Sequence, residues 1–374
     1  MDRRQALAVA VAMWAAPWAA RASGPEGGAL SMGAAWRGPR ETDPQQLGAI
    51  DLDFARRRAA IRWSLPLPSR AHGLLALADG ALLAVATRPG TWLIRCDRDG
   101  KVTRRVDIDG EPDRHRLDGH AVLSADAGWL FTTQTDADGR GWVAVRDAAT
   151  LRTQDRWPTH GVDPHQLLLH PQGGLMVANG GLLRHADGRK RDLNRMASSL
   201  VQLDSRDGAL IGRWTLDDPR LSLRHLAWSR PAADAPPLLG VALQAEHDDP
   251  AHRTRAPTLA VWDGAALRAV ASSSAAAGYA GDIAPAPLGG FAISNHKTRR
   301  AYVWWPTRAD DMPHFTEADE PYALASPGDG PDAGAVLVAC AAGVARWHVA
   351  QAPAMLRWPQ PMALDNHWVA LAAT

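Results

Sequence analysis

Five histidines recur at equivalent places in the sequence, each at the start of a short apolar run. They are His72, His120, His165, His225 and His367. Neutral imidazoles are ligands of transition metals, and they also transfer protons near neutral pH. If the fold gathers these side chains, the first four predict a site for a transition metal, iron or copper. The alternative is a structural role that was copied along with the repeat.

The histidines belong to a module of four short strands that repeats about every 49 residues. Residues 72–78, 81–87, 92–97 and 101–108 form the first module, with turn signals at Asp79-Gly80 and Asp99-Gly100. Further modules begin at residues 120, 165, 225, 282 and 322, and one orphan strand, "ALDNHWVALA", covers residues 363–372. This period is typical of the four-stranded blades of a β-propeller.

The N-terminal region supplies the strands that the orphan lacks. Residues 29–36, 45–53 and 59–68 each favour a strand. Pairing both ends of the chain in one sheet removes a free sheet edge. The sequence therefore predicts an all-β fold, a single seven-bladed β-propeller over residues 28–374 whose last blade is closed by N- and C-terminal strands.

The first strand of a propeller blade lines the central channel, and the antiparallel second strand ends at the mouth where the first begins. The histidines should therefore converge on one mouth. Asp282 and Tyr322 take the equivalent place in the two blades that lack a histidine. Polar residues at the ends of second strands should reach the same mouth. We expect a ligand-binding set of Arg88, Gln134, Asn179, Gln244, Asp282, Asn295 and His367.

The remaining histidines lie off the repeat position. His115, His160 and His170 are expected behind the cluster or on the surface. Surface or loop positions are expected for His185, His247, His252, His296, His314 and His348. Two long loops, residues 180–199 and 245–258, lie on the same rim and can form a lid over the mouth. The alternative for the charged run 184–195 is a solvated loop.

Residues 1–22 have the pattern of an export signal. Arg3-Arg4 precede an apolar stretch that is too short to span a bilayer, and Ala20-Arg21-Ala22 gives a cleavage site. The arginine pair resembles a twin-arginine signal. We expect a periplasmic protein without stable membrane insertion after cleavage. Cys96 and Cys340 are expected to be buried free thiols rather than a disulfide.

Composition and motifs argue against several classes of function. The chain has 41 basic and 40 acidic residues, so it lacks the positive excess that a nucleic-acid partner favours. No Cys-x-x-Cys-His occurs, which excludes covalent c-type haem. The sequence contains no glycine-rich phosphate loop, so a nucleotide cofactor is not expected. It also contains no G-x-S-x-G and no H-E-x-x-H motif.

Several segments together resemble signatures of the bacterial family called domain of unknown function 1513. They are "RAHG" at 70–73, "LDGHAVLSADAGWLFTTQTD" at 117–136, "THGVDPHQLLLHPQGGLMVANGG" at 159–181, "LSLRHLAWS" at 221–229 and "ASPGDGPDAGAVLV" at 325–338. The resemblance covers nearly all of the chain after the signal. It implies a seven-bladed propeller with a twin-arginine-type signal. It also implies a link to periplasmic iron-uptake proteins as partners, but no reaction.

Three hypotheses about function follow. The first is a monomeric periplasmic propeller in which the histidine cluster holds or transfers iron or copper. The second is a metal-free propeller enzyme, a lyase or hydrolase, in which a histidine acts as general base and Arg88 binds an anionic substrate. The third is a protein-binding scaffold whose histidines are structural.

The export route can be tested in the N-terminal arginine pair. We expect the double substitution Arg3→Lys and Arg4→Lys to trap unprocessed precursor, because the twin-arginine route depends on both guanidinium groups. Immunoblotting of cell fractions measures the precursor and the mature form. Normal processing of the double variant would indicate the general secretory route instead.

Overall fold

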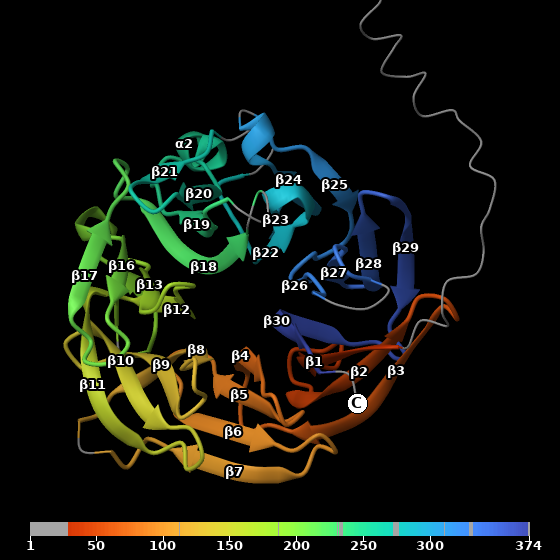
Figure 1. The fold of residues 1–374 in the computed structure, drawn as a ribbon, viewed down its shortest axis with the longest axis horizontal. Coiled ribbons are helices and arrows are strands. Elements are labelled where there is room, and N and C mark those ends of the chain that lie inside the picture. The colour runs from red at the N-terminus through yellow and green to blue at the C-terminus, as the bar shows by residue number, and fades with distance from the viewer. Residues whose placement is uncertain are drawn as a thin grey trace, which may run out of the picture.

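The computed structural model describes residues 29–111, 113–185, 187–229, 231, 235–271, 277–309, 311–328 and 332–372. They form seven four-stranded antiparallel sheets arranged in a ring around a central channel (Figure 1). The prediction of a seven-bladed propeller is confirmed. The expected export signal, residues 1–22, lies outside the described residues.

The blades follow one another along the chain, each from its inner to its outer strand. Blade one contains β4 (Ala71–Ala76), β5 (Leu82–Ala86), β6 (Trp92–Cys96) and β7 (Val102–Asp107), and blade two contains β8 (Arg116–Leu123), β9 (Trp129–Thr135), β10 (Arg140–Asp147) and β11 (Thr153–Val162). Blade three contains β12 (Pro164–Leu169), β13 (Leu175–Asn179), β16 (Ser199–Leu203) and β17 (Leu210–Trp214), and blade four contains β18 (Leu221–Ser229), β19 (Leu238–Ala245), β20 (Leu259–Trp262) and β21 (Leu267–Ala269). Blade five contains β22 (Ile283–Ala286), β23 (Gly290–Asn295), β24 (Arg300–Trp304) and β25 (His314–Glu317), and blade six contains β26 (Leu324–Ala325), β27 (Val336–Cys340), β28 (Gly343–His348) and β29 (Gln351–Arg357).

Blade seven joins the two ends of the described chain. Its strands are β30 (Ala363–Ala370), β1 (Leu30–Arg37), β2 (Gln46–Asp53) and β3 (Arg58–Pro66), from the channel outwards. The C-terminal strand β30 pairs antiparallel with β1, with Gly33 opposite Val369. Met32, Trp36 and Trp368 pack in one apolar cluster between blades six and seven. The predicted closure of the ring by both ends is confirmed.

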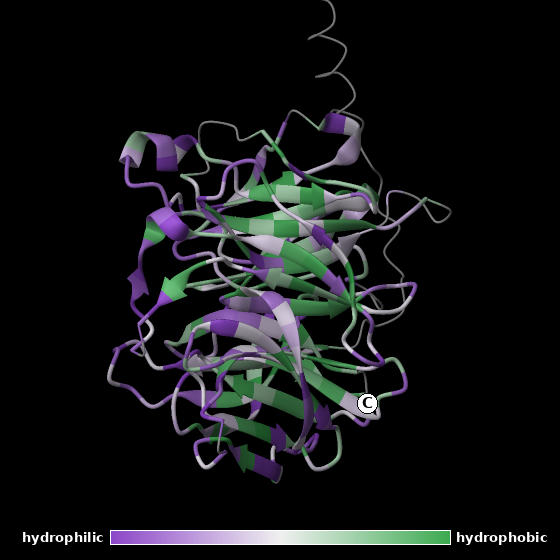
Figure 2. Cartoon of the chain, turned by 90° about the vertical axis from the view of Figure 1, so that its left-hand side faces the viewer, coloured by the Kyte–Doolittle hydropathy of each residue, from purple (hydrophilic) through white to green (hydrophobic). Residues whose placement is uncertain are grey.

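The pattern of burial explains why the middle strands are almost wholly apolar. Every residue of β5, "LLAVA", is buried, because both faces of this sheet are covered by neighbouring blades. In the outer strand β7, exposed and buried residues do not alternate, and most residues are exposed. Figure 2 shows the same arrangement, with hydrophobic residues concentrated in the strands and hydrophilic residues in the connecting loops.

The two long loops carry secondary structure of their own. The blade-three loop forms the hairpin of β14 (Leu183–Arg184) and β15 (Lys190–Arg191), followed by the short helix η1 (Leu193–Arg195). The blade-four loop carries helix α2 (Pro250–Arg255). An ion pair of 2.5 Å between Lys190 Nζ and Glu246 Oε1 joins the two loops. The short helices η2 (Pro287–Gly289) and η3 (Pro306–Arg308) lie in blade five.

Two further observations concern the cysteines and membranes. Cys96 and Cys340 are buried free thiols, as expected. Burial raises the pKa of the Cys96 thiol to about 12, so it remains protonated at neutral pH. Within the described residues, no helix has both the length and the apolar character needed to cross a membrane.

The contribution of β30 to ring closure can be measured at Trp368, whose ring is 5% exposed. We expect Trp368→Ala to lower the free energy of unfolding by about 3–5 kcal/mol, because it leaves a cavity between β30 and its neighbours. Urea denaturation followed by circular dichroism measures the change. The matched control is Trp129→Ala, at a tryptophan that is 42% exposed, where we expect a change within about 0.5 kcal/mol. Equal effects of the two substitutions would contradict this account of ring closure.

Candidate functional site

Each of the five histidines lies where the innermost strand of its blade departs from regular pairing. The ladder skips residues in β4, β8, β12, β18 and β30 at the positions of His72, His120, His165, His225 and His367. Such a bulge leaves residues unpaired and redirects their side chains. The innermost strands therefore aim the histidines into the channel rather than into the interfaces between blades.

Two glycines allow the bulges of blades one and two to approach each other. A Cβ atom at Gly73 would lie 2.2 Å from the carbonyl oxygen of Gly119. A Cβ atom at Gly119 would lie 2.8 Å from Cδ2 of His72, and the φ angle of Gly119 is +102°. Only glycine fits both positions without displacing the backbone or the imidazole. This contact explains the spacing of "HG" in one blade and "GH" in the next.

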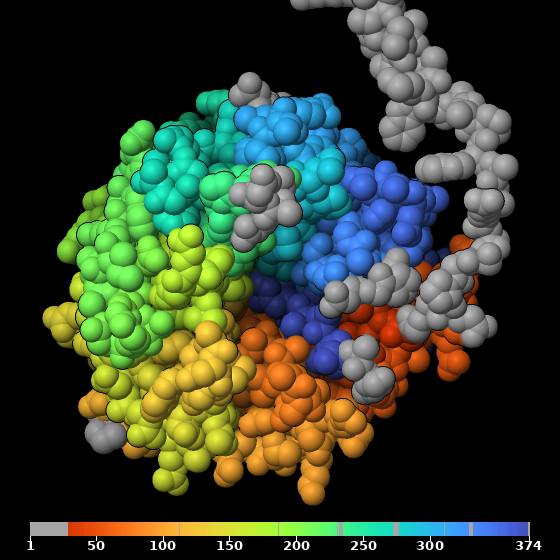
Figure 3. All heavy atoms as spheres, in the orientation of Figure 1, coloured from red at the N-terminus to blue at the C-terminus, as the bar shows by residue number. Residues whose placement is uncertain are grey.

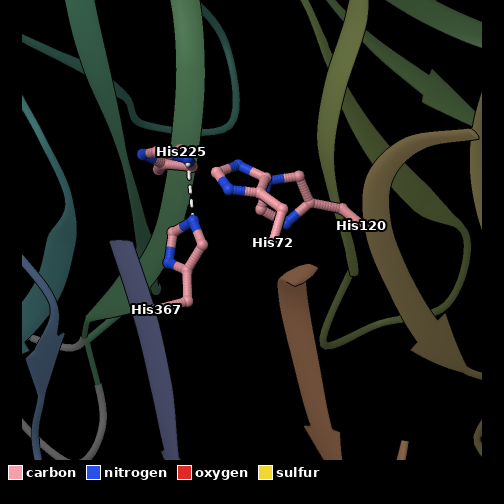
Figure 4. A group of neighbouring side chains, drawn as sticks. All are labelled: His72, His120, His225 and His367. Carbon is pink, nitrogen blue, oxygen red and sulfur yellow. Dashed lines mark hydrogen bonds between the residues drawn. The ribbon is translucent and has the colours of Figure 1, made fainter. Parts of the chain in front are cut away.

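The five imidazoles form one cluster on the axis of the ring. In the pairs that touch, ring centroids lie between 4.3 Å apart, for His225 and His367, and 5.8 Å apart, for His72 and His225. His72, His120, His165 and His225 are at most 7% exposed, and the side chain of His367 is 11% exposed. Figure 4 shows four of these rings pointing toward one another from different strands.

Four of the histidines offer ring nitrogens that all lie within 4.8 Å of one another: His72, His120, His225 and His367. A metal ion bound at about 2.0–2.1 Å holds its nitrogen ligands about 3–4 Å apart, so small side-chain movements would complete such a site. His165 was expected as a ligand and lies in the same cluster, with its Nε2 2.8 Å from Nε2 of His225. His367, which was expected among the ligand-binding residues, belongs to the group of four, and His165 does not.

Two buried carboxylates stand behind the rings of this group. Asp282 Oδ1 lies 3.3 Å from Nδ1 of His367 and 4.0 Å from Nδ1 of His225. Asp365 Oδ1 lies 3.7 Å from Nδ1 of His72. A carboxylate that faces Nδ1 favours the proton on that nitrogen and leaves Nε2 as the electron-pair donor, which is the arrangement found behind metal-bound histidines.

Both carboxylates are held in place by further hydrogen bonds. Asp282 accepts from the backbone N–H groups of Ile283 and Leu324, each at 2.8 Å. Asp365 accepts from Arg70, with Nη2 at 2.9 Å from Oδ1. Burial acts to raise the pKa of Asp365, but the neighbouring imidazole of His72 and the hydrogen bonds from Arg70 outweigh it and hold the pKa well below its usual range.

His165 has a guanidinium behind it instead of a carboxylate. Arg88 contacts Nδ1 of His165 through Nη2, and its Nη1 lies 2.5 Å from Asp163 Oδ1. Because a guanidinium can only donate, Nδ1 of His165 accepts and its Nε2 carries the proton. Asp163 is buried and also pairs with Arg184 at 2.6 Å and Arg224 at 3.0 Å. Burial acts to raise the pKa of Asp163, but these three arginines lower it to about 2.

Four histidines of the cluster, His72, His120, His165 and His225, are uncharged at neutral pH. Burial is the main cause that lowers the pKa of His72 to about 3. Burial is also the main cause that lowers the pKa values of His120, His165 and His225 well below 6.5. Neutral imidazoles are the form that binds metals. Buried nitrogens of His72, His120 and His225 have no hydrogen-bond partner among the described residues.

The expected ligand-binding residues divide into two groups. Arg88, Asp282 and His367 lie in the cluster, and Gln244 lines the cavity next to it. The others have different partners: Gln134 accepts from Arg156 at 3.1 Å, Asn179 donates to Thr159 O at 3.0 Å, and Asn295 accepts from the backbone N–H of Lys297 at 3.1 Å. Tyr322 stacks on His296 with ring centroids 4.7 Å apart.

Histidines off the repeat position lie outside the cluster. The ring of His115 packs on Trp142 and the ring of His170 packs on Trp228. His247 and His252 stack with ring centroids 3.9 Å apart, and Nε2 of His247 lies 2.9 Å from Asp218 Oδ2. His247 is buried, whereas a surface or loop position was expected for it.

Sequence reasoning identified Arg88 and Asp282 but missed three other buried carboxylates near the histidines. An aspartate stands two residues before three of them, in Asp118-Gly119-His120, Asp163-Pro164-His165 and Asp365-Asn366-His367. All three carboxylates are buried beside the channel. The repeated spacing of acid and histidine was the signal that could have identified them.

Comparison with known proteins places the chain in a family. The profile of a protein family of unknown function, DUF1513, matches residues 65–371. The chain belongs to the DUF1513 family. No curated protein matches the sequence.

Solved structures share the fold at low sequence identity. A protein from Lactobacillus plantarum has a TM-score of 0.64 and 14% identity over 92% of this chain and 100% of that one. A putative 6-phosphogluconolactonase from Bacteroides uniformis has a TM-score of 0.59 and 12% identity, covering 90% and 97%. A catalytically inactive histidine-to-alanine variant of virginiamycin B lyase from Staphylococcus aureus, solved with quinupristin, has a TM-score of 0.53 and 8% identity, covering 82% and 92%. At these identities the likeness concerns the fold of this DUF1513 protein and not its reaction.

The neutral cluster makes stability depend on pH. The pKa of His72 is about 3 in the folded protein and 6.5 in an unfolded chain, so between these values the unfolded state binds more protons. We expect the free energy of unfolding of metal-free protein, measured by urea denaturation, to fall as the pH drops from 7 to 5, by up to about 1.4 kcal/mol per pH unit for each such histidine. Asp118, whose pKa burial raises to about 7, opposes this trend, but by one proton against four histidines. A flat profile would contradict the neutral cluster, and His72→Gln should reduce the slope.

Proposed function

We propose that this protein binds one first-row transition metal ion, iron or copper, at the axial histidine cluster. The observation that carries the proposal is the group of four histidine nitrogens within 4.8 Å of one another, with Asp282 and Asp365 behind the rings. All-nitrogen donor sets suit copper, iron and zinc rather than magnesium or calcium. The buried imidazole nitrogens without hydrogen-bond partners fit the same interpretation, because such groups are costly unless something binds them.

The residues at this site would have different roles. His72, His120, His225 and His367 would hold the ion, and the carboxylates would fix the orientation of the rings and increase the basicity of the ligating nitrogens. A bound iron or copper ion would supply Lewis acidity or one-electron chemistry. His165 would direct its Nε2 proton at the cluster, because Arg88 occupies its other nitrogen. Burial leaves little of the four rings of His72, His120, His165 and His225 in contact with solvent.

We further propose that the protein works in the periplasm and acts with iron-uptake proteins there. The support for export is the N-terminal pattern of Arg3-Arg4, an apolar stretch and Ala20-Arg21-Ala22. The support for iron is the resemblance to the family. A neutral histidine site would suit the handling of a metal ion in this compartment.

A second candidate is a metal-free lyase or hydrolase. It is favoured by Asp118, whose pKa of about 7 is that of a proton donor or acceptor at neutral pH. The fold shared with a virginiamycin B lyase supports the same candidate. This candidate expects turnover in protein stripped of metal. It also expects Asp118→Asn to abolish that turnover while His120→Ala leaves part of it.

The metal proposal is tested by elemental analysis of protein purified from the periplasm and by reconstitution with Fe(II) or Cu(II). We expect about one ion per chain, and at least tenfold weaker binding in His120→Ala, because one of the four nitrogens is lost. The matched control is His185→Ala, at an exposed histidine outside the cluster. Less than ~0.1 metal per chain, together with no binding on reconstitution, would refute the proposal.

A further inference from the structure

The histidine cluster adjoins a cavity of about 210 Å³ with a strongly cationic wall. Five cationic side chains line it: Arg70, Arg88, Arg184, Lys190 and Arg224. His72, His165 and His225 line the same cavity, so it reaches the candidate metal site. Among the described residues, no carboxylate lines it. Figure 3 shows a hollow at the centre of the ring.

The cations are only partly neutralised by their ion pairs. Arg88, Arg184 and Arg224 share the single carboxylate of Asp163. Arg70 pairs with Asp365, and Lys190 pairs with Glu246 at 2.5 Å. Five cations are thus paired with three carboxylates, which leaves an excess of two positive charges around the cavity.

Arg224 provides a buried hydrogen-bond donor that lacks an acceptor. Its side chain is 3% exposed, and its Nη1 lies 3.0 Å from Asp163 Oδ2. Its Nε is buried and has no hydrogen-bond partner among the described residues. A buried N–H donor without an acceptor is costly, and a guanidinium edge matches two oxygens of a carboxylate or phosphate. Arg224 lines the cavity through other atoms, so its Nε would reach an anion there after a rotation of the side chain.

We propose that this cavity binds a small oxyanion with two or more negative charges, a polycarboxylate or a phosphate, directly against the histidine cluster. Recognition of the anion rests on the cavity and its cations alone. Its contact with a metal ion rests on the proposed function: one oxygen of the anion would occupy the side of the ion that faces the cavity. The hairpin β14–β15 supplies Arg184 and Lys190, so the long loop of blade three takes part in binding.

Anion and metal should strengthen each other's binding. A divalent ion in the cluster raises the positive charge beside the cavity, and a dianion offsets the repulsion between the ion and Arg70, Arg88 and Arg224. Because such coupling is reciprocal, the anion should raise metal affinity by the same factor by which the metal raises anion affinity.

Isothermal titration calorimetry of the full mature chain tests the proposal, with citrate and inorganic phosphate as probes at constant ionic strength. We expect binding to metal-free protein with a dissociation constant below about 1 mM, and at least tenfold tighter binding to protein loaded with Cu(II). Lys190→Met and Arg224→Met should each weaken binding about tenfold. The matched control is Arg206→Met, at an arginine that is 86% exposed and lies outside the cavity.

The outcomes separate this inference from the metal proposal. Anion binding that Lys190→Met weakens and Arg206→Met does not would support the inference even if the protein binds no metal. No binding of either anion, or equal binding by Lys190→Met and the wild type, would overturn it. Lys190 lies on a surface hairpin with a side chain that is 40% exposed, so this variant should fold even if Arg224→Met does not. The tighter of the two probes identifies the class of anion.

Discussion

Five imidazole rings share one narrow channel, and their packing depends on four of them, His72, His120, His165 and His225, carrying no charge. Ring centroids less than 5 Å apart, as for His225 and His367, leave no room for the hydration that a charged imidazolium requires. Burial therefore lowers the pKa values of His72, His120, His165 and His225 far enough that each stays neutral at any physiological pH. The bulges, the glycine contacts and the closure of the ring all maintain this crowding.

The groups behind the rings divide the cluster into two parts. At 3.3 Å, Asp282 favours the proton on Nδ1 of His367 and an electron pair on its Nε2. Asp365 and Asp282 lie farther from Nδ1 of His72 and of His225, at 3.7 Å and 4.0 Å. Arg88 does the opposite for His165, whose Nε2 becomes a proton donor. Asp163 keeps Arg88 in place, and removal of this carboxylate would leave three arginines in a poorly solvated site without a counter-ion, which is strongly destabilising. The ion pairs thus set the chemistry of the cluster as well as the shape of its mouth.

The sequence predicted the architecture well because a propeller repeats its signals. Strand-like runs, turn signals such as Asp79-Gly80 and the orphan strand at the C-terminus were sufficient to identify the blades and their closure. The inward direction of His72, His120, His165, His225 and His367 followed from their place in the repeat. Gln134, Asn179 and Asn295 have hydrogen-bond partners outside the histidine cluster, which the repeat position alone could not predict, because successive side chains of a strand point to opposite faces. Bulges cannot be located by counting residues, and neither can the ion pairs that join blades far apart in the sequence.

The position of the proton on His225 can be compared with the two short contacts that its Nε2 makes. His225 Nε2 lies 2.8 Å from Nε2 of His165 and 2.9 Å from Nε2 of His367. His165 presents a proton, because Arg88 donates to its other nitrogen, and His367 presents an electron pair, because Asp282 faces its Nδ1. If His225 Nε2 is bare, it accepts from His165 but opposes the electron pair of His367. If it is protonated, it suits His367 but meets the proton of His165. Neither tautomer satisfies both contacts. A cation bound by the electron pairs of His225 and His367 would remove the repulsion between these two nitrogens, and His165 would then have to turn its proton away from His225.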